Sequence, residues 1–287
     1  MDIVCGVDLG GTNTRIAIVD PAGRVVARER DTTPRGTGVQ IARQLAERIA
    51  KLAGTRPIRT VIGVPGAVHP RTGVIRTAPN APRLEGTAFS DALPGSCFVN
   101  DANAALYGEA KAGVVQDSTD AVMVTVGTGV GTAALLQRQL LTGRSGAVGE
   151  FGALPYRHGT FEDACSGSAM TRAAQAAGFD DPRAIFTEPV LRSARSDAFE
   201  ALSQLLATLT TAYDPDIIVL GGGVASSLAQ WLEPLRETLL PITPEPPLIA
   251  LGALGDDAGA IGAAHLALDQ PSAGLLSWDP RHLPRHP

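Results

Sequence analysis

The chain has 287 residues, of which 44% are hydrophobic, and this is enough to build a buried core in one large domain or two smaller ones. Its formal net charge is −5 with no run of five or more like charges, so we expect no nucleic-acid partner and no membrane partner. Three scattered cysteines exclude a disulfide framework and a CxxC metal cluster. Neither a signal-peptide pattern nor an apolar run of roughly 20 residues occurs, so we expect a cytoplasmic protein.

The first part of the chain predicts three strands followed by a helix. Runs rich in β-branched residues at 2–9, 14–20 and 24–30 indicate the strands, with short glycine-containing turns between them. Apolar residues recur at helical spacing from Ile41 to Leu52, and Gly54 can end that helix. The elements expected next are a strand at 60–66, a hairpin at 69–75, a strand at 96–101 and a helix at 102–113.

From residue 121 the same order of elements starts again. Strands are expected at 121–127, 132–137 and 139–143, and helices near 166–177 and 196–213. They are followed by a strand at 216–223, a helix around Trp231, a strand at 247–254 and a helix at 257–268. The chain therefore predicts an α/β fold built from a duplicated βββαβα unit, with a seam near residues 113–120 and a cleft between the two halves.

Each half carries a glycine turn between strand-like runs. The first reads DLGGTN at residues 8–13 and the second reads GTGVG at 127–131. Glycines let a phosphate approach the backbone N–H groups, and threonine hydroxyls add donors, so both turns suit a polyphosphate. A turn that serves only the geometry of a hairpin is the alternative for either one. Neither turn is a Walker A loop, because the chain contains no GxxxxGK[ST] pattern.

Three further polar features follow from the residues alone. Asp8 ends a strand beside the first turn and suits a contact to Mg²⁺. Asn100 and Asp101 come directly after another strand, where Asp101 can cap the following helix, bind a polyhydroxylated ligand, or do both. Glu150 and Glu162 lie among glycines and aromatic residues, and could equally be solvated loop acids. The glycines at 221–223 follow a strand and suit packing against a flat base, or merely start a helix.

With these motifs in order, the sequence resembles the ROK family of sugar kinases, within the actin-like ATPase superfamily that includes hexokinases. The matching segments are DLGGTNTRIAIVD, GVPGAVHPRTGVIRTAPN, VNDANAALYGEA, VGTGVGTAAL and LGGGVA, together with GEFG, FEDACSGSAM and DDAGAIGAA. They extend from Asp8 to about Ala264, nearly the whole chain, in the family's order. The resemblance implies two actin-like (ribonuclease H-like) domains, at residues 1–116 and 117–287, with the last helix able to pack back on the first domain.

The resemblance also implies roles for individual residues. Asp101 would be the general base that takes the proton from the sugar's primary hydroxyl. The sugar would be contacted by Gly66, Asn80, Asn100, Asp101, Glu150 and Glu162. ATP would be held by Gly10, Gly11, Thr12, Asn13, Thr128, Gly129, Gly222 and Gly223, with Mg²⁺ near Asp8. A small-molecule sugar is the expected partner, in a homodimeric protein.

One departure from the family concerns its zinc site. Members usually carry GExGH followed by CxCGxxGC, but GEFG here continues into Ala153, and no cysteine lies before Glu162. We therefore expect no structural zinc. His158 lies in the shortened loop, where it either substitutes for the family histidine or is simply solvated.

The expected reaction is transfer of the γ-phosphate of ATP to the 6-hydroxyl of a hexose, with glucose as first choice. The missing histidine leaves open a kinase for an amino sugar, such as an aminohexose or N-acetylmannosamine, or for a sugar-like cyclitol. An alternative of another class is a non-catalytic sugar sensor or transcriptional regulator. ROK repressors carry a DNA-binding segment before the DLGGT motif, whereas only seven residues precede Asp8, and the presence of Asp101 argues against a sensor.

Overall fold

The computed structural model describes residues 3–54, 58–69, 74–78, 81–86 and 93–269. Its contacts divide the chain into two compact units. The first unit contains the described residues up to Asn100, the segment Thr142–Val148 and the described residues from Ala263; the second contains Asp101–Leu141 and Gly149–Gly262. The domain boundary expected at residues 116 and 117 stays a prediction.

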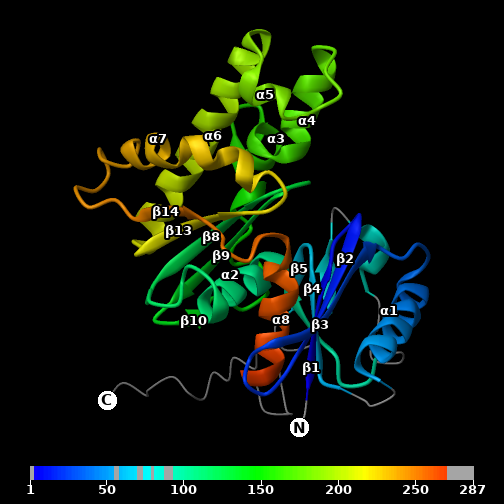
Figure 1. Cartoon of the computed structure of the whole chain (residues 1–287). Coiled ribbons are helices and arrows are strands. Elements are labelled where there is room, and N and C mark those ends of the chain that lie inside the picture. The colour runs from blue at the N-terminus through cyan, green and yellow to red at the C-terminus, as the bar shows by residue number, and fades with distance from the viewer. Residues whose placement is uncertain (1–2, 55–57, 70–73, 79–80, 87–92, 270–287) are drawn as a thin grey trace, which may run out of the picture. The chain divides into compact units, whose positions relative to one another are not determined.

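The first unit is built on a sheet with the strand order β3-β2-β1-β4-β7 (Figure 1). Strands β1 and β2, and β2 and β3, pair antiparallel, whereas β1, β4 and β7 run parallel. The strands span β1 Val4–Leu9, β2 Asn13–Val19, β3 Val25–Thr32, β4 Thr60–Val64 and β7 Cys97–Asn100. A short antiparallel pair is formed by β5 Ala67–Val68 and β6 Ile75–Thr77, and residues 70–73 of the hairpin expected at 69–75 lie outside the described residues. A 3-10 turn, η1, follows at Pro82–Leu84.

Helix α1 (Gly38–Ala53) begins and ends where its sequence predicts. A capping box closes its start, because the Thr37 side chain accepts from the Gln40 N–H while the Gln40 side chain reaches back to the Thr37 N–H. Ile41 and Leu45 are fully buried against the sheet, and Gly54 ends the helix at a φ of 78°. The helix therefore covers one face of the sheet with its apolar stripe.

The second unit repeats the plan of the first. Its sheet has the order β10-β9-β8-β13-β14, with β8, β9 and β10 antiparallel and β8, β13 and β14 parallel. The strands span β8 Ala121–Val126, β9 Val130–Leu136, β10 Gln139–Leu140, β13 Ile217–Gly221 and β14 Leu248–Leu251. A two-stranded hairpin is formed by β11 Pro155–Tyr156 and β12 Gly159–Thr160. The same strand order and directions in both sheets confirm the predicted duplication.

Helices of the second unit pack on this sheet and on one another. They are α2 Asp101–Ala112, α3 Phe161–Cys165, α4 Gly167–Ala176, α5 Ala184–Thr187, α6 Arg192–Tyr213 and α7 Leu232–Glu237. The helix expected around Trp231 is instead a 3-10 segment, η5 Ala225–Trp231, that continues into α7. The last helix, α8 Ala258–Asp269, is divided between the units after Gly262.

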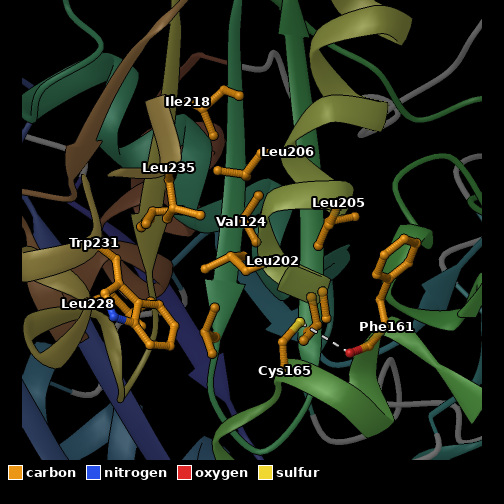
Figure 2. Close-up of a cluster of buried hydrophobic side chains, with 14 of the residues drawn as sticks. Val124, Phe161, Cys165, Leu202, Leu205, Leu206, Ile218, Leu228, Trp231 and Leu235 are labelled. Atoms are coloured by element: carbon orange, nitrogen blue, oxygen red, sulfur yellow. Dashed lines mark hydrogen bonds between the residues drawn. The ribbon is translucent and has the colours of Figure 1, made fainter. Parts of the chain in front are cut away.

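The core of the second unit lies between its sheet and α6 (Figure 2). Leu202, Leu205 and Leu206 of α6 are fully buried against Val124 and Ile218 of the two central strands. This apolar contact fixes β8, and with it the turn that follows β8 at residue 127.

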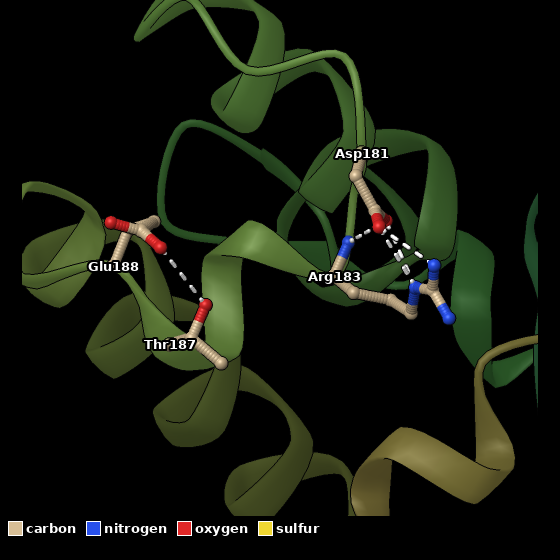
Figure 3. A network of polar contacts seen from close by, with 4 residues as sticks. All are labelled: Asp181, Arg183, Thr187 and Glu188. Atoms are coloured by element: carbon tan, nitrogen blue, oxygen red, sulfur yellow. Dashed lines mark hydrogen bonds and ion pairs between the residues drawn. The ribbon is translucent and has the colours of Figure 1, made fainter.

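Polar contacts, in contrast, order the exposed segment between α4 and α6 (Figure 3). Asp181 accepts from the backbone N–H of Arg183 and pairs with its guanidinium at 2.8 Å, and this hydrogen bonding lowers the pKa of Asp181. Thr187 Oγ1 lies 3.3 Å from Glu188 Oε1. Because both pairs face solvent, they shape the segment locally and add little to global stability.

The three cysteines are all unbridged. Cys5 and Cys165 are buried, and burial raises the pKa of each thiol to about 12, while Cys97 is half-buried at the start of β7. No helix within the described ranges has both the length and the apolar character needed to cross a membrane.

Candidate functional site

The first glycine turn, residues 10–13 between β1 and β2, has all its carbonyl oxygens engaged. Thr33, just after β3, supplies two of the donors: its hydroxyl donates to Gly10 O at 2.6 Å and its N–H to Thr12 O at 2.8 Å. The Gly10 N–H donates to Asn13 O at 3.0 Å. The fourth donor is Arg83, whose Nη2 lies 3.3 Å from Gly11 O. A Cβ at Gly10 would lie 2.9 Å from Asn13 O, so this turn needs glycine there.

The N–H groups of the same turn are left open. Within the part of the chain that the structure describes, nothing accepts a hydrogen bond from the backbone N–H of Gly11 or Thr12, and both residues are exposed. A turn whose carbonyls are all engaged while neighbouring N–H groups face solvent presents a positive surface. The open N–H groups of the first turn therefore suit an anion.

Asp8 lies near the end of β1, just before this turn. Asp8 is paired with Arg15 across the β1–β2 ladder, and Asp8 Oδ2 lies 3.3 Å from Arg15 Nη1. The ion pair is largely buried, with 17% of the Asp8 side chain and 15% of the Arg15 side chain exposed. Arg15 therefore balances the charge of Asp8. The described residues contain no group of three or more His, Cys, Asp or Glu side chains able to hold a metal ion. A single carboxylate such as Asp8 suits a Mg²⁺ ion that takes its other ligands from phosphate oxygens and water.

Two of the expected sugar-contact residues in the first unit lie together. Asn100, at the end of β7, donates through Nδ2 to Gly66 O at 3.1 Å, because β4 and β7 are parallel neighbours that end at the same edge. Gly66 has a φ of 98°, and a Cβ there would lie 2.0 Å from Thr77 O, so no other residue fits. Asn80 lies outside the described residues.

Asp101 is the first residue of α2, directly after Asn100 in the chain. Its side chain is half-buried, and Oδ1 accepts from the Ala102 N–H at 2.8 Å. This contact joins neighbouring residues and is not the cap to the second or third N–H of the helix, so the capping role of Asp101 stays a prediction. The Ala102 N–H thus helps to orient the carboxylate at the junction of strand and helix.

The second glycine turn resembles the first in its polarity. Gly127 N–H donates to Gly129 O at 2.9 Å, whereas the N–H groups of Thr128 and Gly129 have no acceptor among the residues described. A Cβ on Gly167, the first residue of α4, would lie 2.8 Å from Gly127 O. The turn therefore meets the start of a helix, where further N–H groups favour an anion.

The glycine loop after β13 meets the strand that precedes this turn. Gly222 has a φ of 86°, and a Cβ there would lie 2.5 Å from Val126 O, which itself accepts from the Val224 N–H at 3.1 Å. Gly223 faces open space. Thr128, Gly129, Gly222 and Gly223 thus lie on two adjoining loops of one unit, as their common assignment to ATP requires.

Glu150 and Glu162 lie close enough for the charge of Glu162 to affect the pKa of Glu150. Glu162, in α3, accepts from the Val130 N–H at 2.9 Å, so it holds the residue at which the turn passes into β9. Partial burial raises the pKa of Glu150, and the negative charge of Glu162 raises it further. The side chains of Glu150 and Glu162 are therefore suited to accept hydrogen bonds from neutral hydroxyl groups.

The shortened loop lies between these two acids. Ala153 ends a 3-10 turn, Phe151–Ala153, and is exposed. His158 is exposed in the turn of the β11–β12 hairpin and lines a cavity of about 440 Å³ with residues of α3 to α6. Neither Glu150 nor Glu162 lines that cavity. Whether His158 substitutes for the family histidine therefore stays a prediction.

Thr33, Arg15 and Arg83 are site residues that we did not identify from the sequence. Thr33 and Arg83 contact the first turn from 23 and 72 residues away in the chain, so no local pattern reveals them. Arg15 could have been found, because hairpin pairing of the strands on either side of a short turn places it opposite Asp8.

Comparison with known proteins yields one family and a set of similar kinases. The model of the ROK family matches residues 4–270. The chain is 27% identical to a glucokinase of Thermotoga maritima, over 91% of this chain and 96% of that protein. It is 32% identical to the bifunctional enzyme NanE/NanK of Brucella melitensis, over 92% of this chain and 54% of that protein. The crystal structure of a ROK family glucokinase from Streptomyces griseus in complex with glucose and AMPPNP has a TM-score of 0.79 and 26% identity, covering 93% of this chain and 100% of that one.

Proposed function

The chain belongs to the ROK family, and we propose that it is an ATP-dependent hexose kinase that transfers the γ-phosphate to the 6-hydroxyl of its sugar, with glucose as the first candidate. The observation that carries the proposal is the polarity of the two glycine turns. Each offers a pair of backbone N–H groups without acceptors among the described residues. The family resemblance assigns both turns to phosphate binding.

Each residue of the candidate site has its own role in the proposed in-line phosphoryl transfer. Gly11 and Thr12 donate backbone N–H groups to phosphate oxygens at the first turn, and Thr128 and Gly129 do so at the second, which stabilises charge on the transferring group. Asp101 accepts the proton of the attacking hydroxyl, with its carboxylate oriented by the Ala102 N–H. Mg²⁺ near Asp8 would neutralise phosphate charge when it is bound.

The sugar is assigned to the residues that the family resemblance names for it. In this proposal Gly66, Asn80, Asn100, Glu150 and Glu162 contact its hydroxyls. Asn100 and Glu162 are each held by a hydrogen bond of their own, to Gly66 O and from the Val130 N–H, so they meet the sugar in fixed positions. Binding therefore costs little side-chain ordering at these two residues.

Ala153 supports a second group of substrates. In the family a histidine at this position reaches hydroxyls near the anomeric carbon, and alanine offers no donor there. An unpaired buried hydroxyl costs about 1–3 kcal/mol, which corresponds to roughly 5- to 150-fold weaker binding of glucose. We therefore propose weak discrimination around carbons 1 and 2, so that an aminohexose, N-acetylmannosamine or a cyclitol is an alternative substrate. Discrimination at the 4- and 6-positions should stay strong.

An ADP-release assay on a sugar panel tests both parts of the proposal. The panel is glucose, mannose, glucosamine, N-acetylmannosamine, 2-deoxyglucose, galactose and a cyclitol, each measured as kcat/KM. We expect ADP release with at least one hexose, and smaller differences among glucose, mannose and 2-deoxyglucose than between glucose and galactose. Glucose binding without ADP release from any sugar would instead identify a non-catalytic sensor or regulator.

The Asp101→Asn variant tests the assigned base. Asparagine keeps a side-chain oxygen for the helix cap but cannot take a proton, so turnover should fall on the order of 10²- to 10⁴-fold while the fold is kept. Turnover close to that of the wild type would remove Asp101 from this role. A homodimer in the cytoplasm remains part of the proposal, and light scattering on the purified chain measures the oligomeric state.

A further inference from the structure

Arg83 approaches the first glycine turn from a different segment of the chain. It lies in the 3-10 turn η1, and its Nη2 donates to Gly11 O at 3.3 Å. Gly11 is one of the two residues whose backbone N–H faces solvent without an acceptor in the described part of the chain. The guanidinium therefore lies beside the turn, on the side of the Gly11 carbonyl.

The segment that carries Arg83 is anchored on both sides. Leu84 and Ala81 are buried, and the Leu84 N–H donates to Ala81 O at 2.9 Å. Glu85 Oε1 accepts from the Ala78 N–H at 2.7 Å, and the Gly86 N–H donates to Ile75 O at 3.2 Å. The backbone under Arg83 is held by these contacts, so the direction of its side chain does not depend on the weak bond to Gly11 alone.

Among the described residues, no acidic side chain balances the charge of Arg83 in the way that Asp8 balances that of Arg15. Arg15 forms an ion pair with Asp8, whereas the only acceptor of Arg83 among the described residues is the neutral Gly11 oxygen. A guanidinium has five N–H donors, of which this contact uses one. An exposed guanidinium that no described acid neutralises, at a turn with open backbone N–H groups, has the chemistry that recognises a phosphate.

We propose that Arg83 is a phosphate-binding residue of the donor site, which completes the anion site of the first turn with a charged donor. This inference rests on the proposed function, because it assigns the anion to the phosphates of ATP. Gly11 O orients the guanidinium, and the remaining N–H groups donate to phosphate oxygens. The segment after β6, which the family resemblance assigns to the sugar, would then also contact the phosphoryl donor.

The test compares four variants of the full chain with one anion. Isothermal titration with magnesium-free sodium tripolyphosphate measures anion binding directly, and the KM for ATP and for the preferred sugar are measured alongside. Arg83→Ala should weaken tripolyphosphate binding and raise the KM for ATP by about ten-fold or more, since a charged hydrogen bond contributes about 1.5–3 kcal/mol. The KM for the sugar should change less than twofold.

Two further substitutions separate charge from a structural role. Arg83→Lys keeps the charge and should retain most of the binding, whereas Arg83→Gln keeps only the ability to donate to Gly11 O and should behave like Arg83→Ala. Arg43→Ala, on the exposed face of α1, removes the same charge elsewhere in the unit and should leave tripolyphosphate binding unchanged. If Arg83→Ala does not fold, as judged by circular dichroism, the comparison of lysine with glutamine still decides the question.

Three results would overturn the inference: unchanged tripolyphosphate binding in Arg83→Ala, wild-type binding in Arg83→Gln, or an equal loss in Arg43→Ala. None of them affects the proposed function, which is judged by ADP release from the wild type with the sugar panel. Conversely, a wild type that phosphorylates no sugar would refute the proposed function whatever the binding data show for Arg83.

Discussion

Glu109 is a fully buried carboxylate in α2, the helix that Asp101 begins, and its removal should be costly. Its Oε2 accepts from the N–H groups of Val114 and Ala253 at 3.0 and 3.1 Å, and its Oε1 accepts from the Leu254 N–H at 2.9 Å. The side chain thus joins the end of α2 to the loop that follows β14. Because all three donors are backbone groups, no substitution at position 109 removes them.

The expected cost follows from these three contacts. A hydrogen bond to a charged group contributes about 1.5–3 kcal/mol, and an N–H left unsatisfied costs about 1–3 kcal/mol. Water can reach part of the loop, because Ala253 is exposed, and the energies are not additive. We therefore expect Glu109→Ala to lower the free energy of unfolding by about 2–4 kcal/mol. Glu109→Gln should lower the free energy of unfolding by about half as much, because the amide oxygen can still accept. The amide NH2 group, however, would face a backbone N–H group, and both are donors.

Urea unfolding of the full chain, followed by circular dichroism, measures both variants. The control is Glu47→Ala on the exposed face of α1, which should change the free energy of unfolding by less than about 0.5 kcal/mol. If Glu109→Ala lowers the free energy of unfolding by less than about 1 kcal/mol, the reasoning is refuted. The three backbone hydrogen bonds would then not outweigh the cost of burying the carboxylate.

Three further outcomes are expected. Leu205→Ala, at a fully buried position of α6, should lower the free energy of unfolding in urea by about 2–5 kcal/mol, whereas Val190→Ala, at a site with 70% exposure, should leave it nearly unchanged. The raised pKa of Glu150 means that the folded chain holds this proton more tightly than the unfolded chain, so stability is lost as the pH rises through that pKa; Glu150→Gln should melt above the wild type at neutral pH, and the gap should close toward acid pH. A gap that widens toward acid pH would contradict that sign. Elemental analysis of the purified protein should find no stoichiometric zinc, and a chelator should leave the Tm unchanged; one tightly held zinc per chain would contradict our interpretation of the shortened loop.

The elements with strong local signals were predictable from the sequence. The β-branched runs on either side of the first glycine turn became β1 and β2, and the apolar spacing from Ile41 to Ile49 became the buried stripe of α1. The duplicated order could be read because both halves repeat these signals. Elements without such signals were missed or misplaced: α3 has only five residues, and the expected strand at 139–143 is reduced to Gln139–Leu140.

The polarity of the candidate site could be predicted only in part. Glycine and threonine in the first turn indicate that its backbone can approach a phosphate, but they do not show which of its polar groups remain open. That depends on the donors that engage its carbonyls, and Thr33 and Arg83 come from segments far along the chain. Likewise, nothing near Glu162 in the sequence reveals that it holds the Val130 N–H. Such contacts depend on tertiary packing, which leaves no periodic pattern.

The different surroundings of the three thiols give the chain a built-in labelling position. With a pKa of about 12, Cys5 and Cys165 hold on the order of 10⁻⁵ of their population as thiolate at pH 7, so alkylating reagents meet almost no nucleophile there. Cys97 is the least buried of the three and lies at the other end of β7 from Asn100. A maleimide-linked fluorophore or spin label should therefore attach first at Cys97 and report on the strand that carries Asn100 without any cysteine being added or removed.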